Sequence, residues 1–425
     1  MRSDANQVYI LGSSRTPFAK SQTVYADVTR KELMVASLNG LIRKNNLQKK
    51  FIGDTALGCL MNSSKDWNLA RECVLETELD PNSPAYNTQR ACALSLDNVW
   101  QIAMKIHTGA IDIGIAGGVD TNSDFPIEVS DKFRKFLMKM NNAKSFGARM
   151  SALSSASFGM LKPSAASVTE PRTLMSMGQH CELMAKEWKI SREEQDEIAY
   201  NSHINAAKAY DSGFFDDLVI PFHGITRDAT LRADTSKERL AKLKPSFDPQ
   251  NGTLTAGNSS PLTDGAASVL LGSESAAQKM GLFPMAKVID VQVAAVDFVH
   301  GAGLLMAPTK AVAQLLIRNN LTFKDFDYFE IHEAFAAQVL CNLKAWESAT
   351  YCKDVLGLKS PLGAIDRSKM NVVGSSVAMG HPFAATGARI TGTLAKLLAS
   401  GSKKRGLISI CTAGGMGVAA ILESV

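Results

Sequence analysis

A cysteine at the start of a predicted helix is the first residue whose type and position suggest chemistry. The polar run 87–90 leads to Cys92, and the apolar residues beyond it recur at the spacing of a helix with one buried face. Unpaired N–H groups and the dipole at a helix N-terminus lower a thiol pKa from its usual value of about 8.5. Arg90 adds positive charge nearby. Cys92 is therefore a candidate nucleophile, and a small buried hydrophobic residue is the structural alternative.

Three further candidate reactive side chains lie, like Cys92, where a predicted strand ends or a predicted helix begins. His332 and Cys411 each follow a strand-like apolar run, and His381 opens a helical segment. Open α/β sheets carry their reactive groups at such strand ends. A thiolate that attacks a carbonyl, a histidine that removes the thiol proton and a second thiol that exchanges protons are suited to covalent acyl transfer. Glycine-rich backbone beside Cys411 and imidazole N–H groups could hold an oxyanion. This chemistry needs no metal and no redox cofactor.

The elements that would position these four side chains indicate an α/β fold. Strands are predicted at 7–12, 55–60, 111–116, 327–331 and 406–410, and helices at 30–45, 67–78, 191–210 and 384–400. Ser191 and Glu194 form a capping-box pattern at the start of one of these helices. In each half a candidate reactive residue opens a helix, and the next strand ends in Ala-Gly-Gly, at 116–118 and at 413–415. This weak repeat predicts a duplicated fold.

Size and composition are those of an ordinary globular protein. The 425 residues exceed the roughly 250–300 that one core supports, and 45% are hydrophobic. A net charge of +5 without a zinc-finger or RNA-binding motif does not indicate nucleic-acid binding. The seven cysteines are scattered with no CxxC pair, which favours reduced thiols, a cytoplasmic location and no zinc site. The first apolar run is too short for a signal peptide, and no run is long enough to predict a membrane-spanning helix.

The middle of the chain, from about 121 to 250, is richer in polar residues and helix. Its segment 131–140 carries apolar side chains at helical spacing. The basic residues between them are Lys132, Arg134, Lys135 and Lys139. Such a basic amphipathic helix lies on a membrane, docks on a partner, or packs on its own protein with a solvated basic side. The sequence leaves these alternatives open.

Motifs spread over nearly the whole chain resemble those of the thiolase family. The matching segments are 14–18, 90–92, 116–120, 177–178, 191–193, 241–245, 256–260, 264–266, 332–335, 380–382 and 411–415, in the family's order and approximate spacing. Most thiolases have asparagine where this chain has His332. The form His332-Glu333-Ala334-Phe335 resembles the β-subunit branch of the fatty-acid oxidation trifunctional complex, and Pro261 resembles its bacterial members.

This resemblance implies a role for each reactive residue. Cys92 would be the acylated nucleophile, His381 would activate it, and Cys411 would be the acid and base for the α-carbon of acetyl-CoA. Backbone N–H groups of Cys92 and Ala413 would form one oxyanion hole. His381, with a water held by His332, would form the other.

The resemblance also implies that coenzyme A and acyl-CoA are substrates and that no cofactor or metal is permanently bound. Ser260 and Phe335 match positions that contact pantetheine. Arg232 matches a position near the nucleotide, and Met177 matches a position in the acyl pocket. Arg239 stands where short-chain relatives have a serine.

A five-layered αβαβα fold of two similar halves with an inserted loop domain follows from the same resemblance. Residues 1–123 would form the N-terminal half, completed by about 251–283. Residues 124–250 would form the loop domain, and residues 284–425 would form the C-terminal half.

The activity implied is that of a 3-ketoacyl-CoA thiolase (acetyl-CoA C-acyltransferase) of fatty-acid β-oxidation, working through an acyl-Cys92 intermediate. The alternatives are a short-chain acetoacetyl-CoA thiolase (acetyl-CoA C-acetyltransferase), which His332 disfavours, and a non-catalytic acyl-CoA-binding protein of this fold. Cys411 disfavours a condensing ketoacyl synthase. Related thiolases are dimers or dimers of dimers. In the trifunctional branch part of the loop domain touches the membrane or the hydratase/dehydrogenase α-subunit, so the 131–140 helix is a candidate for either contact, and the protein would be cytoplasmic or peripherally membrane-associated.

Overall fold

The N-terminal half is a mixed sheet with helices on both faces. The computed structural model describes residues 6–165 and 169–425. The elements of this half are β1 (Val8–Arg15), β2 (Ala19–Lys20), α1 (Arg30–Lys44), β3 (Asp54–Leu57), α2 (Leu69–Leu75), β4 (Ala85–Asn87), α3 (Leu94–His107), β5 (Ile113–Asp120), β8 (Thr263–Ser273) and α9 (Glu274–Met280). The strands β5 and β8 are buried along their whole length. Burial on both faces explains why these strands read as continuous runs of small and apolar residues.

The C-terminal half repeats this arrangement. Its elements are β9 (Ala286–Ala295), α10 (Ala307–Arg318), β10 (Tyr328–Ile331), α11 (Ala336–Glu347), α12 (Ala349–Asp354), α13 (Ser376–Met379), α14 (Thr386–Ala399), β11 (Arg405–Thr412) and β12 (Met416–Glu423). The strand order β1-β8-β5-β3 of the first half returns as β9-β12-β11-β10, with the same parallel and antiparallel pairings. The duplicated α/β fold predicted from the sequence is confirmed.

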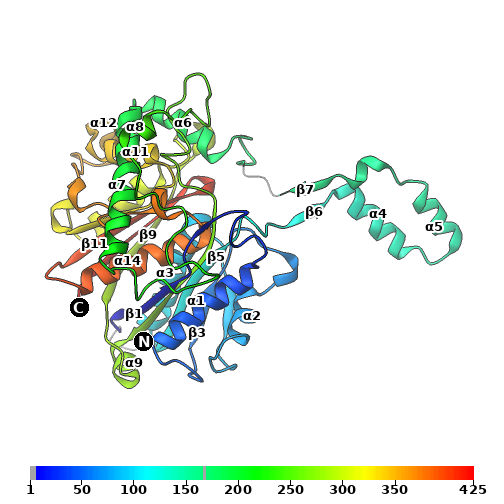
Figure 1. Ribbon diagram of the computed structural model, residues 1–425, viewed down its shortest axis with the longest axis horizontal. Helices are drawn as coiled ribbons and strands as arrows, with labels where there is room; N and C mark the ends of the chain where they lie inside the picture. Colours follow the sequence, from blue (N-terminus) through cyan, green and yellow to red (C-terminus); the bar gives the residue numbers. More distant parts are fainter. Residues whose placement is uncertain (1–5, 166–168) are drawn as a thin grey trace.

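The helices and strands are arranged in layers (Figure 1), and hydrophobic cores fill the space between the layers. The helices α1 and α2 pack on the outer face of the first half, α10 and α11 pack on the outer face of the second, and α3 and α14 lie together between them. A Cβ on Gly387 would lie 2.4 Å from the Leu96 backbone nitrogen, so α14 and α3 approach closely only because residue 387 is glycine. One feature was not predicted: Val8–Ile10 pair with Ala286–Val288, which joins the two halves into one ten-stranded sheet.

The region between β5 and β8 has two parts, one within the body of the molecule and one outside it. The helices α6 (Met177–Glu187), α7 (Arg192–Asp211) and α8 (Lys237–Ala241) belong to the body, and α6 and α7 share a core with α11. Helix α7 begins at Ser191 with the predicted capping box.

The second part is an arm that projects from the body (Figure 1). It consists of β6 (Ile127–Val129), α4 (Asp131–Asn142), α5 (Phe146–Leu153), the short helix η3 (Phe158–Leu161) and β7 (Pro163–Ala165), with β6 and β7 paired as its stem. The helix predicted at 131–140 is therefore present. The helix packs on its own protein, on α5 and η3 of the arm, but the expectation that it faces the core is wrong, because α4 has no buried residue. Among the described residues, no helix is both long and apolar enough to cross a membrane.

Candidate active site

Cys92 lies in a tight turn between β4 and α3. The turn is the short helix η2 (Ala91–Ala93), and Ala91 has a φ of +44°, a left-handed conformation that residues with a Cβ rarely adopt. The turn packs against β11 and against the short helix η7 (Phe383–Ala385), which follows His381. The strained turn thus brings the predicted nucleophile to the centre of the molecule, where both halves meet.

Two backbone N–H groups, those of Ala413 and of Cys92 itself, act on the Cys92 thiol to lower its pKa. They are the pair predicted for an oxyanion hole. The expected low thiol pKa is not found: burial raises the pKa of Cys92 to about 12, although both N–H groups act to lower it. Arg90 is also engaged elsewhere, because its Nε lies 3.0 Å from a carboxylate oxygen of Asp97. Cys92 is therefore a thiol in the resting protein and needs a base.

His381 is placed to be that base. Its backbone N–H donates to Thr263 Oγ1 at 2.8 Å, and its Nδ1 lies 2.6 Å from Thr386 Oγ1. The other ring nitrogen, Nε2, is buried and has no hydrogen-bond partner. Burial, aided by the charge of Arg389, lowers the pKa of His381 to about 3, so the ring is neutral. A neutral imidazole with one nitrogen held and the other free can accept a thiol proton.

His332 lies beside His381 at the end of β10. The ring centroids are 4.2 Å apart with planes at 51°. The His332 backbone N–H donates to Ser409 O at 2.9 Å, and Nδ1 lies 2.8 Å from Ser376 Oγ. Its Nε2 is also buried without a partner. Burial, followed by the nearby His381 and Arg389, holds the pKa of His332 well below its usual value.

Cys411 completes the set at the end of β11. Burial raises its pKa well above the usual thiol value, and the neighbouring Cys92 raises it further. The backbone beyond it turns through Gly414, whose φ is +74°, and places the Ala413 N–H near Cys92. The structure thus places His332 beside His381, and Cys411 and the Ala413 N–H near Cys92. The two groups are linked by the packing of the Cys92 turn on η7, which begins two residues after His381.

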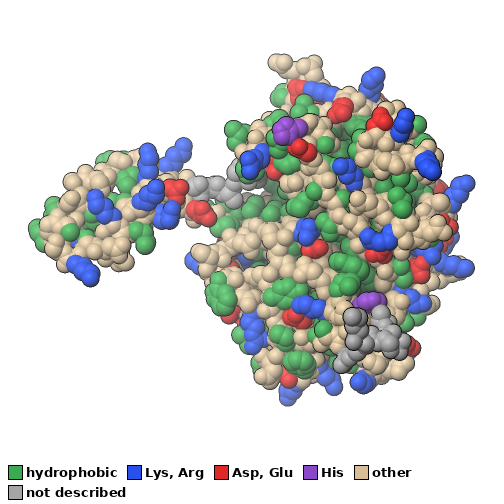
Figure 2. Space-filling model, turned by 180° about the vertical axis from the view of Figure 1, so that it is seen from behind, with side chains coloured by type: hydrophobic (Ala, Val, Ile, Leu, Met, Phe, Trp, Pro, Cys, Tyr) green, Lys and Arg blue, Asp and Glu red, His purple; other side chains and the backbone are tan. Residues whose placement is uncertain are grey.

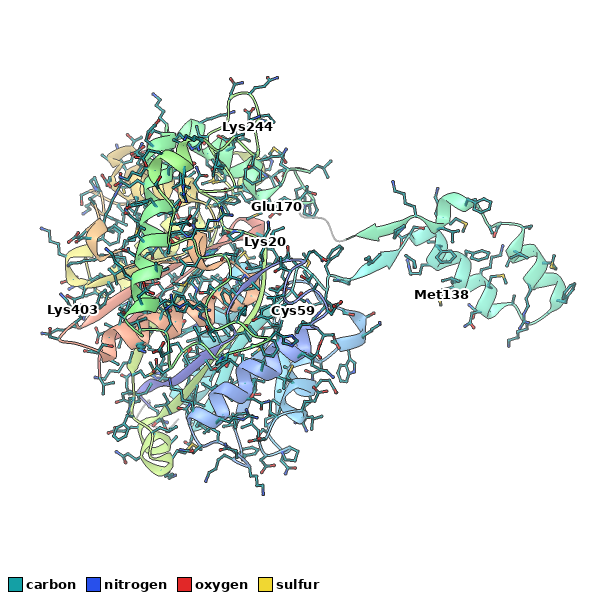
Figure 3. All side chains as sticks on the ribbon, viewed as in Figure 1. Lys20, Cys59, Met138, Glu170, Lys244 and Lys403 are labelled. Atoms are coloured by element: carbon teal, nitrogen blue, oxygen red, sulfur yellow. The ribbon has the colours of Figure 1, made fainter. Side chains whose placement is uncertain are left out.

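Two carboxylates of the site were not predicted. Asp120 accepts the N–H groups of Leu60, Met61 and Ala384, which ties the end of β5 to the turn after His381. The position of Asp120 at the end of the motif 116–120 could have indicated this role from the sequence. Glu170, at the edge of the body where the arm begins (Figure 3), accepts the Gly414 N–H at 2.8 Å, and nothing in the sequence pointed to it.

Three of the four predicted CoA-contacting residues share one region. Ser260 Oγ donates to Ala334 O at 2.9 Å, one residue before Phe335. The rings of Phe335 and Phe247 meet edge to face with centroids 5.7 Å apart, and Met177 packs on the same core. Arg232 is exposed on the surface and stands apart from the other three in these contacts. The Arg239 guanidinium pairs with Asp234.

No metal-ligand cluster accompanies these residues. Across 6–165 and 169–425, no group of three or more histidine, cysteine, aspartate or glutamate side chains could hold a metal ion.

Comparison with known proteins agrees with this architecture. Two family models match: Thiolase, N-terminal domain, over residues 8–275, and Thiolase, C-terminal domain, over residues 282–424. Proteins named 3-ketoacyl-CoA thiolase from Shewanella sp. (strain W3-18-1) and Yersinia pestis (strain Pestoides F) are 39% and 40% identical over 423 and 425 residues, which is 98% of this chain and 97% of each relative.

Solved structures extend the comparison. The acetyl-CoA acetyltransferase of Bacillus anthracis has a TM-score of 0.81 at 31% identity and covers 99% of this chain and 100% of its own. Human mitochondrial 3-ketoacyl-CoA thiolase has a TM-score of 0.81 at 27% identity and covers 99% of both chains. The fold and the matching family models define an acyltransferase. The chain belongs to the thiolase family.

Proposed function

We propose that this protein is a 3-ketoacyl-CoA thiolase of fatty-acid degradation, which cleaves 3-ketoacyl-CoA with CoA to give acetyl-CoA and a shortened acyl-CoA. The observation that carries the proposal is the grouping of two thiols, two backbone N–H groups and a histidine pair. Cys411 and the Ala413 N–H lie near Cys92, and the Cys92 turn packs on η7, which follows His381. The rings of His381 and His332 lie side by side, each with an unpartnered Nε2. This set supplies a nucleophile, a base, an acid and two kinds of oxyanion donor.

The first half-reaction forms the acyl-enzyme. His381 Nε2 takes the Cys92 proton, and the sulfur attacks the 3-keto carbon. The N–H groups of Cys92 and Ala413 hold the resulting oxyanion. When the oxyanion collapses, the C2–C3 bond breaks, and its electron pair forms the enolate of acetyl-CoA. Cys411 protonates C2 of the enolate, so acetyl-CoA leaves and the acyl group stays on Cys92.

The second half-reaction releases the product. The Cys411 thiolate takes the proton of an incoming CoA thiol. Burial raises the pKa of Cys411, which makes its thiolate a strong base. The CoA sulfur attacks the Cys92 thioester, the acyl group moves to CoA, and the Cys92 sulfur regains its proton from His381. Both thiols then return to their starting state.

The test is thiolysis of acetoacetyl-CoA and of a long-chain 3-ketoacyl-CoA with free CoA. Activity on the long-chain substrate, lost in Cys92→Ser, is expected. Activity confined to acetoacetyl-CoA would replace the proposal with a short-chain thiolase, the activity named for the Bacillus anthracis relative. No turnover by a folded chain that binds acyl-CoA tightly would favour the non-catalytic alternative.

We further propose that the arm is a peripheral membrane anchor. Between 127 and 165 the chain has seven basic and two acidic residues, a net charge of +5 that equals the net charge of the whole protein. Figure 2 shows these basic side chains gathered on the arm. A cationic surface that also exposes apolar residues is suited to the headgroup region of an anionic bilayer.

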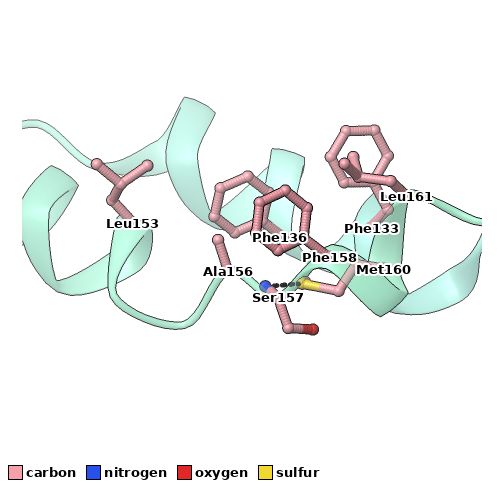
Figure 4. Close-up of a pocket in the computed structure, with 8 residues that line it drawn as sticks. All are labelled: Phe133, Phe136, Leu153, Ala156, Ser157, Phe158, Met160 and Leu161. Atoms are coloured by element: carbon pink, nitrogen blue, oxygen red, sulfur yellow. Dashed lines mark hydrogen bonds between the residues drawn. The ribbon is translucent and has the colours of Figure 1, made fainter.

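The apolar part of the arm is a pocket between its two layers (Figure 4). It has a volume of about 320 Å³ and is lined by Phe133, Phe136, Leu153, Ala156, Ser157, Phe158, Met160 and Leu161. Phe158 is 94% exposed and Phe146 is 81% exposed, which is unusual for phenylalanine in contact with water. The hydratase/dehydrogenase α-subunit is the alternative occupant of this surface. Binding of that subunit without lipid would favour it.

Two further assignments complete the proposal. We infer a homodimer or dimer of dimers, because β4 ends the sheet with one side unpaired, and such an edge is a natural place for a second chain. Light scattering after gel filtration would test this oligomeric state.

We also infer a cytoplasmic, peripherally membrane-associated protein, because all seven cysteines are free and buried. Recovery of disulfide-bonded protein from cells would contradict that location.

A further inference from the structure

A buried arginine is connected to the catalytic histidine pair through one hydroxyl. Arg389, on α14, is 2% exposed, and its Nη2 lies 2.7 Å from Ser376 Oγ. The same Ser376 oxygen lies 2.8 Å from His332 Nδ1. Ser376 and His332 are fully buried. These three side chains form a continuous chain of hydrogen bonds that ends at the imidazole.

The direction of each hydrogen bond follows from the groups present. A guanidinium can only donate, so Ser376 Oγ accepts from Arg389. The serine hydroxyl has one proton, and its other contact is His332 Nδ1, so that proton is donated to Nδ1. A protonated Nδ1 would leave the buried serine proton without an acceptor, so the unprotonated Nδ1 is the favoured arrangement.

The charges of the two end groups agree with this direction. Burial, with His381 and Arg389 nearby, holds the pKa of His332 well below its usual value, so the ring carries one proton only. Burial lowers the pKa of Arg389 to about 10, with Glu330 opposing the shift, so the guanidinium stays charged at neutral pH and stays a donor. The single imidazole proton then has only Nε2 to occupy.

We propose that Arg389 and Ser376 are positioning residues that fix His332 in its Nε2–H tautomer, so that His332 presents a hydrogen-bond donor to the reacting thioester oxygen. The proposal rests on the thiolysis proposed above. His332 Nε2 is buried, has no partner and belongs to the ring that lies beside His381. A donor there stabilises the enolate oxygen of acetyl-CoA, directly or through one water. The opposite tautomer would turn a lone pair toward the same negative charge and repel it.

The enolate arises only when a C–C bond breaks, so the Nε2–H donor of His332 should matter for thiolysis and not for acyl exchange. Exchange of an acyl group between simple acyl-CoA and CoA uses Cys92 and its N–H groups but forms no enolate. Loss of the Ser376 hydroxyl should therefore slow thiolysis of a 3-ketoacyl-CoA and spare exchange. A defect that merely disturbs the fold would slow both reactions.

The experiment uses Ser376→Ala, with Ser375→Ala as the matched control. Ser375 is also buried and adjacent, but the hydroxyl that lies 2.8 Å from His332 Nδ1 belongs to Ser376, and Ser375 Oγ lies 3.5 Å from Arg389 Nη2. The first readout is 15N NMR of histidine-labelled full-length protein, with the His332 resonances assigned from His332→Asn. The wild type and Ser375→Ala should show a protonated Nε2 and a bare Nδ1. Ser376→Ala should show both tautomers.

The second readout is the kinetics of both reactions. Ser376→Ala should lose about tenfold or more in kcat for C–C cleavage, approaching the ~10²–10³ seen when an oxyanion donor is removed, and keep acyl exchange within about twofold. An unchanged tautomer in Ser376→Ala, or equal losses in both reactions, would overturn the inference. If the wild type fails to cleave 3-ketoacyl-CoA, the proposed function fails, while the NMR readout still decides whether Ser376 sets the tautomer.

Discussion

His332 and His381 come from different turns of the C-terminal half, yet their ring centroids lie 4.2 Å apart and each ring leaves Nε2 without a partner. Each Nδ1 is held by a hydroxyl, Ser376 for one ring and Thr386 for the other. The two histidines are therefore oriented separately. Because their neutral rings can each carry a different tautomer, one can accept a proton while the other donates a hydrogen bond.

The Thr386 hydroxyl can be removed with little change of shape in Thr386→Val. His381 loses the 2.6 Å contact that orients its ring, so we expect kcat to fall about tenfold or more, in both C–C cleavage and acyl exchange, because His381 serves both. Steady-state assays of the two reactions measure this. Thr391→Val is the control, since Thr391 is equally buried on α14 but donates to Gly387 O. Equal activity in Thr386→Val and wild type would mean that packing alone orients His381.

Alkylation of Cys92 should increase steeply with pH. Burial raises the pKa of Cys92 to about 12, so the thiolate fraction, and with it the rate of reaction with iodoacetamide, should grow about tenfold for each pH unit between 7 and 9. Mass spectrometry of the Cys92 peptide gives the rate, and Cys92→Ser shows the background from the other six cysteines. A rate that is already level by pH 7 would reveal a stable thiolate–imidazolium pair, with the opposite sign of pKa shift.

The helices and strands around Cys92 could be predicted from the sequence, whereas the pKa of its thiol could not. Hydrophobic periodicity and the capping box at Ser191 and Glu194 are local, so the helices and strands, and the repeat of the two halves, could be predicted. The thiol pKa could not, because it depends on how deeply a residue is buried by segments from elsewhere in the chain. The helix-terminus argument predicted the effect of the N–H groups but not the larger effect of burial.

The same reasoning applies to the supporting residues. Ser376 and Arg389 lie 44 and 57 residues after His332, and no local pattern marks them as its partners. Glu170 reaches Gly414 across 244 residues. For the arm, periodicity predicted the helix at 131–140 but could not say what its apolar face would meet. Pairings between distant residues are set by the tertiary structure.

Glu170 should support the oxyanion hole through Gly414. Its Oε1 accepts the Gly414 N–H at 2.8 Å, next to the Ala413 whose N–H acts on the Cys92 thiol to lower its pKa. Glu170→Ala removes this support, and we expect acylation of Cys92 to slow by about tenfold. Glu170→Gln keeps an acceptor oxygen and should retain most of the rate. Rapid-quench measurement of the acylation burst tests both. Equal bursts in Glu170→Ala and wild type would show that the loop holds its shape without the carboxylate.

Gly387 should be essential for the packing of the two central helices. An alanine Cβ there would lie 2.4 Å from the Leu96 backbone nitrogen, and backbone cannot move aside cheaply. We expect Gly387→Ala to destabilise the fold by about 1–3 kcal/mol, seen as a lower urea midpoint. Gly401→Ala, where a Cβ would meet nothing within 4 Å, is the control. Similar midpoints for both variants would mean that α3 and α14 can separate without cost.

Charge reversal on α4 tests the membrane proposal. In Lys132→Glu, Arg134→Glu, Lys135→Glu and Lys139→Glu combined, four cations become anions on a helix that buries no residue, so the fold should be unaffected. At about 1 kcal/mol for each basic residue at an anionic surface, binding to phosphatidylglycerol vesicles should weaken more than about 100-fold. Cosedimentation with vesicles measures binding, and thiolysis of acetoacetyl-CoA shows whether the active site is intact.

The matched control reverses four exposed lysines of the body, Lys50, Lys279, Lys324 and Lys359. This variant has the same net charge as the arm variant, so a general attraction between protein and membrane would weaken equally in both. If the arm is the anchor, only the arm variant loses binding, and the wild type also releases from vesicles as salt rises. Equal loss in both variants would assign the binding to net charge. Retained binding in the arm variant would leave the exposed apolar residues, Phe146 and Phe158 among them, as the remaining contact.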